Sequence, residues 1–229
     1  MASACAPELN SAFMEATRAL AREAAQTKRS FMDWAASLEV VQAEWLVAHG
    51  TTVDALAQAA IRHDLLVLDH ARNGEGMPGD LPGVILRAGA PCLVLPAHGV
   101  DFKGIERVAI GWNSSPEAMR AVHAALPLLQ GRETLLLRGE EREQFPGLEW
   151  EPPFDIVEYL DRHGVRVEQR NIDARRDDAA GELLEEALEY EADLFVMGAY
   201  GRSRFSEWML GGVTRYVLTW SSLPVLMRH

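Results

Sequence analysis

The stretch Asp193–Arg215, DLFVMGAYGRSRFSEWMLGGVTR, organises the rest of the chain. It begins with the apolar run Leu194–Met197, which is typical of a buried strand. Gly198 and Gly201 bracket a bend, and Gly211-Gly212 opens a second regular segment. A strand that ends in glycines close to a helix N-terminus presents unpaired N–H groups to an anion. The stretch therefore suggests a phosphate-binding loop, although the same spacing also suits a plain turn.

Strands and helices alternate on both sides of this stretch. In the second half, the predicted strands are Arg107–Gly111, Thr134–Arg138, Val165–Ile172, Leu194–Met197 and Pro224–Met227. The predicted helices between them are Pro116–Leu129, Pro153–His163, Asp178–Glu189 and Gly212–Thr219. In the first half, we expect helices at Ser11–Leu38, Thr52–His63 and Pro82–Ala88, and strands at Ala43–Ala48, Leu65–Leu68 and Cys92–Leu95. Such alternation predicts an α/β fold, an open parallel sheet with helices on both faces.

The two halves share an internal repeat. The segment Asp64–Asp69 matches Asp193–Gly198, and Gly83-Val84 matches Gly212-Val213 at the same offset. We therefore predict two copies of one α/β unit, residues 1–100 and residues 101–229. Only the later helices and strands are found in the first copy, which also lacks the glycines of the loop.

Composition narrows the classes of partner. The formal net charge of −12 disfavours nucleic-acid and anionic-membrane partners, and no apolar run approaches a membrane-spanning length. The cysteines Cys5 and Cys92 stand apart, without metal-site spacing, and Cys92 lies in an apolar strand that favours an inert thiol. We expect a cytoplasmic protein.

The second half resembles the universal stress protein family. The resemblance is carried by the strand and turn Val108–Pro116, by the spacing Gly198-x2-Gly201-x9-Gly211, and by the terminal Leu223–Leu226. It covers Arg107–His229 closely and Ser11–Leu95 loosely, so that the whole chain resembles tandem-domain members with a truncated, degenerate first domain. It implies a Rossmann-like sheet of strand order 3-2-1-4-5 in the second domain, and pairing of the two copies through their fifth strands.

The resemblance also implies a ligand, ATP or AMP with Mg²⁺ or Mn²⁺. The residues that it places beside this nucleotide are Asn113, Ser114, Met197, Gly198, Gly201, Arg202, Ser203, Gly211, Gly212 and Val213. Two of them depart from the family pattern, because ligand-binding members carry Asp at the position of Asn113 and a hydroxyl at that of Gly212. Each departure removes a hydrogen bond to a charged group, so binding is expected to be weak.

Two functions follow as hypotheses. In the first, the chain is a stress-response regulator that binds an adenine nucleotide in its second domain. In the second, it is a scaffold without nucleotide that acts through dimerisation and protein partners.

The incomplete sheet of the first copy predicts a homodimer, with the long first helix exchanged between chains. No catalytic residues are assigned, so that any enzymatic activity is limited to slow ATP hydrolysis. In the plain reading of Asn113-Ser114-Ser115, the segment is only a turn and a helix cap.

Overall fold

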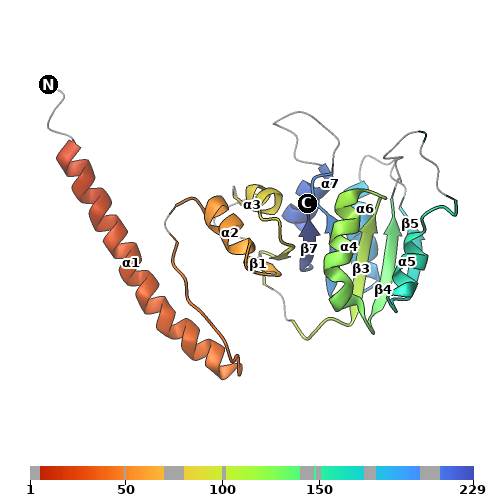
Figure 1. Cartoon of the computed structure of the whole chain (residues 1–229), viewed down its shortest axis with the longest axis horizontal. Coiled ribbons are helices and arrows are strands. Elements are labelled where there is room, and N and C mark those ends of the chain that lie inside the picture. Colours follow the sequence, from red (N-terminus) through yellow and green to blue (C-terminus); the bar gives the residue numbers. More distant parts are fainter. Residues whose placement is uncertain are drawn as a thin grey trace. The chain divides into compact units, whose positions relative to one another are not determined.

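The computed structural model describes most of the chain, and Figure 1 traces its elements. The described residues are 6–48, 50–69, 80–99, 102–139, 147, 151–172, 179–201 and 212–229. They fall into two compact units, Met1–Gly50 and Thr51–His229. The predicted loop Ala71–Asp80 lies outside the described residues except for Asp80.

The first unit is built on the helix α1, Ala6–Ser37. Residues 38–48 follow it without regular secondary structure, so the predicted strand Ala43–Ala48 is wrong. The Trp45 ring instead packs on Phe31 of the helix, with 5.3 Å between ring centroids. A strand needs a neighbouring strand to pair its backbone N–H and C=O groups, and the apolar character of residues 43–48 does not supply one.

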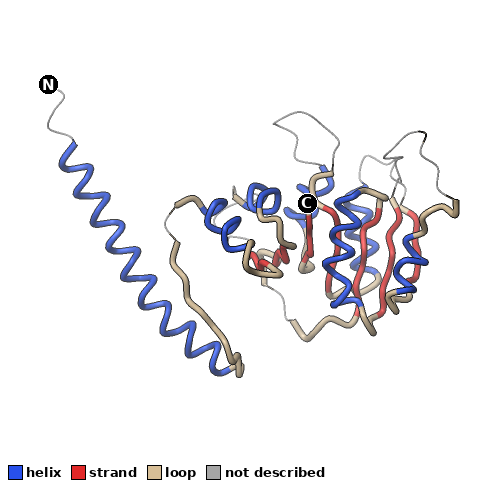
Figure 2. The backbone as a smooth tube through the Cα atoms, in the orientation of Figure 1, coloured by secondary structure: helices blue, strands red, loops and turns tan. Residues whose placement is uncertain are grey.

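The second unit is one sheet with helices on both faces (Figures 1 and 2). Its strands are β1 Leu66–Asp69, β2 Cys92–Leu95, β3 Arg107–Trp112, β4 Glu133–Arg138, β5 Val167–Asn171, β6 Leu194–Gly198 and β7 Val225–Arg228. Its helices are α2 Thr52–Ala60, α3 Leu81–Arg87, α4 Pro116–Leu129, α5 Ile156–Arg162, α6 Ala179–Glu189 and α7 Gly212–Trp220. Helix α5 begins later than predicted because the Asp155 carboxylate caps it, accepting a hydrogen bond from the Val157 N–H at 2.8 Å.

The strand order across the sheet is β1-β2-β7-β6-β3-β4-β5. Within the second half, β3 to β7 are parallel and follow the predicted order 3-2-1-4-5, which is confirmed. The sheet as a whole is mixed rather than parallel, because β2 and β7 are antiparallel. Leu93 lies opposite Leu226 in this pair, so the predicted pairing of the two fifth strands is also confirmed.

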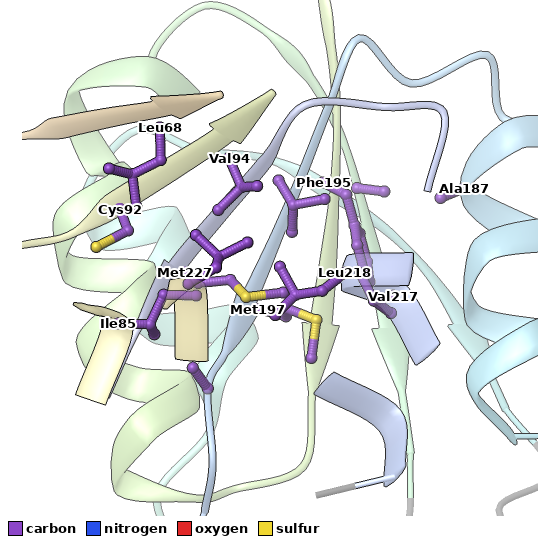
Figure 3. Close-up of a cluster of buried hydrophobic side chains, with 14 of the residues drawn as sticks. Leu68, Ile85, Cys92, Val94, Ala187, Phe195, Met197, Val217, Leu218 and Met227 are labelled. Atoms are coloured by element: carbon purple, nitrogen blue, oxygen red, sulfur yellow. The ribbon is translucent and has the colours of Figure 1, made fainter. Parts of the chain in front are cut away.

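Two apolar layers hold the helices on the sheet. Residues of α2, α3, α6 and α7 form one core with one face of the sheet, and residues of α4 and α5 form a second core on the other face. Figure 3 shows part of the first core, where Cys92, Met197 and Met227 lie among aliphatic side chains and Phe195. Burial raises the pKa of the Cys92 thiol to about 11, in agreement with an inert thiol.

The second face is covered unevenly. Val67, Leu93 and Leu226 stand side by side on β1, β2 and β7. Leu226 is 1% exposed and packs in the core of α4, Leu93 is half-buried, and Val67 is 59% exposed. The apolar row thus continues beyond the helices that cover it, onto the edge strand of the first half.

This gradient predicts different costs for the same substitution along the row. Leu226→Lys should lower the free energy of unfolding by about 3 kcal/mol or more, because it places a charge in a dry core. Val67→Lys is the matched control and should change the free energy by about 0.5 kcal/mol or less, since the ammonium group stays in water. Urea unfolding of both variants and the parent measures this. Equal costs at the two positions would contradict the covering of Leu226 and the exposure of Val67.

Candidate functional site

The candidate site lies at the carboxyl ends of β3 and β6. These two strands are adjacent, with Gly111 opposite Met197. The chain leaves β3 for α4 on one face and leaves β6 for α7 on the other. Connections that diverge from adjacent parallel strands leave a crevice, the usual place for ligands in open α/β sheets. Because Gly111 pairs with Met197, Asn113 and Gly198 both come at the carboxyl ends of their strands, as predicted.

The turn after β3 uses its polar groups internally. The Asn113 side-chain oxygen accepts a hydrogen bond from the Ser115 N–H at 3.2 Å, and Ser114 has a φ of 57°. The Ser115 hydroxyl oxygen accepts from the Ala118 N–H at 3.1 Å, which caps α4. The segment therefore does form a turn and a helix cap, and Asn113 is exposed beside it.

Gly198 is required by the packing of α4. A Cβ at this position would lie 2.4 Å from the backbone nitrogen of Ala118 and 2.6 Å from the carbonyl carbon of Glu117. Its φ lies outside the left-handed range, so positive φ is not the reason for glycine here. The expectation of a left-handed turn is therefore wrong, and the close approach of the α4 backbone is itself sufficient reason for glycine.

The loop that follows Gly198 is anchored at several points. The Ala199 N–H donates to the Arg228 carbonyl at 2.9 Å, and a His229 ring nitrogen lies 3.0 Å from the Ala199 carbonyl oxygen. The Tyr200 N–H donates to the Thr214 hydroxyl oxygen of α7 at 3.3 Å, and Tyr200 has a φ of 54°. Burial raises the pKa of the Tyr200 phenol to about 12. Thr214 therefore ties the loop to the first turn of α7.

Glu117 is the site residue that sequence reasoning missed. It is the second residue of α4, and its side chain is only 6% exposed. Its Oε1 accepts from Arg120 at 3.3 Å, while its Oε2 has no hydrogen-bond partner within the described part of the chain. This Oε2 lies 3.4 Å from the point that a Cβ on Gly201 would occupy. An acid in the first turn of a helix ordinarily indicates an exposed charge, so the sequence held no signal of this burial.

The remaining predicted site residues are distributed over both walls and the core. Met197 is buried, and its side chain points into the core with Leu218 and Met227 (Figure 3), so only its backbone faces the strand end. Gly212 begins α7, and no atom of the described residues lies within 4 Å of its would-be Cβ, while Val213 packs against the core. Arg202, Ser203 and Gly211 lie outside the described residues.

Other features of the described chain are separate from this crevice. A concavity of about 490 Å³ is lined by residues 152–155 and by Glu158, Tyr159 and Arg162 of α5, none of which belongs to the candidate site. The described residues hold no group of three or more His, Cys, Asp or Glu side chains suited to a metal ion. None of the helices in the described ranges has the length and apolar character needed to cross a membrane.

Comparison with known proteins agrees with this fold. The model of the universal stress protein family matches residues 104–229, more than half of the chain, which therefore belongs to that family. A universal stress protein from Archaeoglobus fulgidus is 16% identical with a TM-score of 0.67, over 91% of this chain and 78% of that one. A putative universal stress protein from Pseudomonas aeruginosa is 12% identical, with a TM-score of 0.57. The match covers 88% of this chain and 77% of that one. No curated protein matches the sequence. The two structures share the fold with this chain over both of its halves.

The contact at Gly198 predicts a large difference between two glycines of the site. Gly198→Ala should lower the free energy of unfolding by about 2 kcal/mol or more, because its Cβ meets backbone atoms of α4 that have little room to move. Gly212→Ala, the matched control, should be neutral or stabilising by up to about 1 kcal/mol, since it adds a methyl group in open space on a helix. Thermal and urea unfolding provide the measurement. Equal stability of the two variants would remove the packing explanation for Gly198.

Proposed function

We propose that the chain is a cytoplasmic stress-response regulator that binds an adenine nucleotide weakly, between the α4 and α7 sides of the crevice. The observation that carries the proposal is the adjacency of β3 and β6 at their carboxyl ends, with a glycine-containing loop tied to α7 by Tyr200 and Thr214. Ala199 and Tyr200, at the start of this loop, are already held by hydrogen bonds to Arg228 and Thr214, so they lose little entropy when a ligand binds. Membership of the family supports the choice of nucleotide.

The contacts that we propose are mainly backbone contacts to phosphate. Gly201 and Gly212 are both exposed and carry no side chain that would block a phosphate group. Arg202, Ser203 and Gly211 follow in the same loop and add a guanidinium donor, a hydroxyl donor and a further amide. Asn113 and Ser114 contribute from the turn after β3, and Met197, Gly198 and Val213 shape the site through their backbone. A divalent cation, Mg²⁺ or Mn²⁺, accompanies the nucleotide.

This proposal predicts a dependence on phosphate number. The parent should bind ATP more tightly than AMP, and added salt should weaken binding, because the proposed contacts act on charged phosphates.

Restoring the family residues with Asn113→Asp and Gly212→Ser should tighten ATP binding about tenfold or more, since each change returns a hydrogen bond to a charged group. A carboxylate at position 113 keeps an acceptor for the Ser115 N–H, and a Cβ at position 212 has no neighbour within 4 Å in the described part of the chain.

Calorimetry on the parent and the double variant measures these affinities. Heat denaturation of the purified protein, followed by chromatography of the supernatant, tests for nucleotide that copurifies. Thermal unfolding controls for the fold of the double variant. If the folded double variant binds no adenine nucleotide, the crevice is not a nucleotide site.

The second candidate function is a scaffold that acts through dimerisation. We infer that residues 1–100 are a truncated copy of the family unit, because α2-β1-α3-β2 repeats the order of α6-β6-α7-β7 and pairs with it through β2 and β7. Val196, the repeat partner of Val67, is fully buried beside α4, whereas Val67 is 59% exposed. The first copy thus has an apolar sheet face that corresponds to a covered one in the second copy. The long α1 of a second chain is the occupant that we propose for it.

A homodimer is the expected outcome of this inference. Light scattering coupled to gel filtration should give twice the mass of the chain at micromolar concentration. Leu20 and Leu38 are 67% and 57% exposed, so replacing both with Ser removes apolar surface and should shift the protein towards the monomer. Lys28→Ser, on the same helix, is the control and should leave the mass unchanged. A monomeric parent at micromolar concentration would contradict the dimer.

A further inference from the structure

The wall of the crevice formed by α4 carries a buried carboxylate oxygen, Oε2 of Glu117, beside the loop. Helix N-termini usually offer free N–H groups to anions. Here the Ser115 N–H is bonded to Asn113 and the Ala118 N–H is bonded to the Ser115 hydroxyl oxygen. Pro116 has no N–H group. Among the buried side-chain atoms of this wall, the one that lacks a partner within the described residues is Oε2 of Glu117.

The burial of this oxygen has no explanation in the packing of the described residues. The Glu117 side chain is 6% exposed, and Arg120 engages only its Oε1, at 3.3 Å. Burying a carboxylate oxygen without a hydrogen bond is costly, and the favourable interaction with the helix dipole does not supply a hydrogen bond. The oxygen lies beside Gly201, at 3.4 Å from the position of a would-be Cβ. It therefore faces the loop that the proposed nucleotide phosphates approach.

A carboxylate and a phosphate are both anionic acceptors, so a phosphate group bound beside Gly201 would be repelled by Glu117. Magnesium ions in proteins are commonly bound by one or two carboxylates together with phosphate oxygens and water. A single buried carboxylate oxygen with no partner among the described residues fits this pattern, and phosphate and water would supply the remaining ligands. The other oxygen is held by Arg120, which fixes the orientation of the carboxylate.

We propose that Glu117 makes phosphate binding in the crevice depend on a divalent cation, by repelling bare phosphate and binding the cation that accompanies it. The inference rests on the proposed nucleotide function and adds a specificity-determining residue to it. It also compensates in part for Asn113, which lacks the carboxylate that ligand-binding family members carry. Glu117 lies four residues further along the chain and brings a carboxylate to the same crevice.

The test compares ATP binding in excess Mg²⁺ with ATP binding in EDTA, by calorimetry, for three proteins. In the parent, Mg²⁺ should raise the affinity about tenfold or more. In Glu117→Gln, which keeps the size of the side chain, the affinity in EDTA should equal or exceed that of the parent. The Mg²⁺ effect should then shrink about fivefold or more. Glu185→Gln removes an equal charge from the exposed face of α6 and should behave like the parent. Comparison across variants cancels the binding of Mg²⁺ to ATP in solution.

Two further measurements separate the outcomes. Thermal unfolding checks that Glu117→Gln is folded, and Glu117→Asp, which keeps a shorter carboxylate, should show an intermediate Mg²⁺ effect. If Glu117→Gln binds ATP with the same ratio of affinities as the parent, the role of Glu117 is wrong while the nucleotide function stands. If none of the proteins binds ATP in either buffer, the proposed function fails and this inference fails with it.

Discussion

The site depends on a contact between two backbones, that of Gly198 at the end of β6 and that of the first turn of α4. A side chain at Gly198 would meet the Ala118 nitrogen at 2.4 Å, so any other residue would push the helix away from the strand. The contact places the start of α4 over the carboxyl end of β6, although α4 follows β3 in the chain. It thereby sets one wall of the crevice and brings Glu117 beside the glycine loop. The same glycine that indicated a ligand in the sequence is a packing requirement.

Much of the fold could be predicted, because the signals for it are local or repeated. Apolar runs between polar turns marked all the strands of the second half, and the resemblance to the family supplied their order. The resemblance also implied that the two fifth strands would pair, and β2 and β7 do. Residues 43–48 were wrongly predicted to form a strand, because an apolar segment indicates only that its side chains are to be buried. It does not indicate whether they pack on a sheet or, as Trp45 does, on a helix.

The site was less predictable, since its features are set by tertiary packing. Glycine spacing cannot distinguish a place where a ligand approaches from one where a helix approaches, and Gly198 belongs to the second kind. An acid in a first helical turn suggests a solvated charge, yet the Glu117 side chain is buried and its Oε2 lies beside Gly201. Thr214 accepts a hydrogen bond from the Tyr200 N–H, a contact that the sequence did not indicate. In each case the deciding atom belongs to a residue distant in sequence.

These contacts change the meaning of the two departures from the family pattern. Asn113 and Gly212 lie on opposite walls of the crevice, one before α4 and one at the start of α7. On the α4 wall, the loss of a carboxylate at 113 is accompanied by a buried carboxylate at 117, so that wall keeps an acidic group. On the α7 wall, the missing hydroxyl leaves an exposed backbone with room beside it. Under the proposed nucleotide function, the Glu117 carboxylate on the α4 wall would take a cation or a hydrogen-bond donor, and the exposed backbone at the start of α7 would take the phosphate.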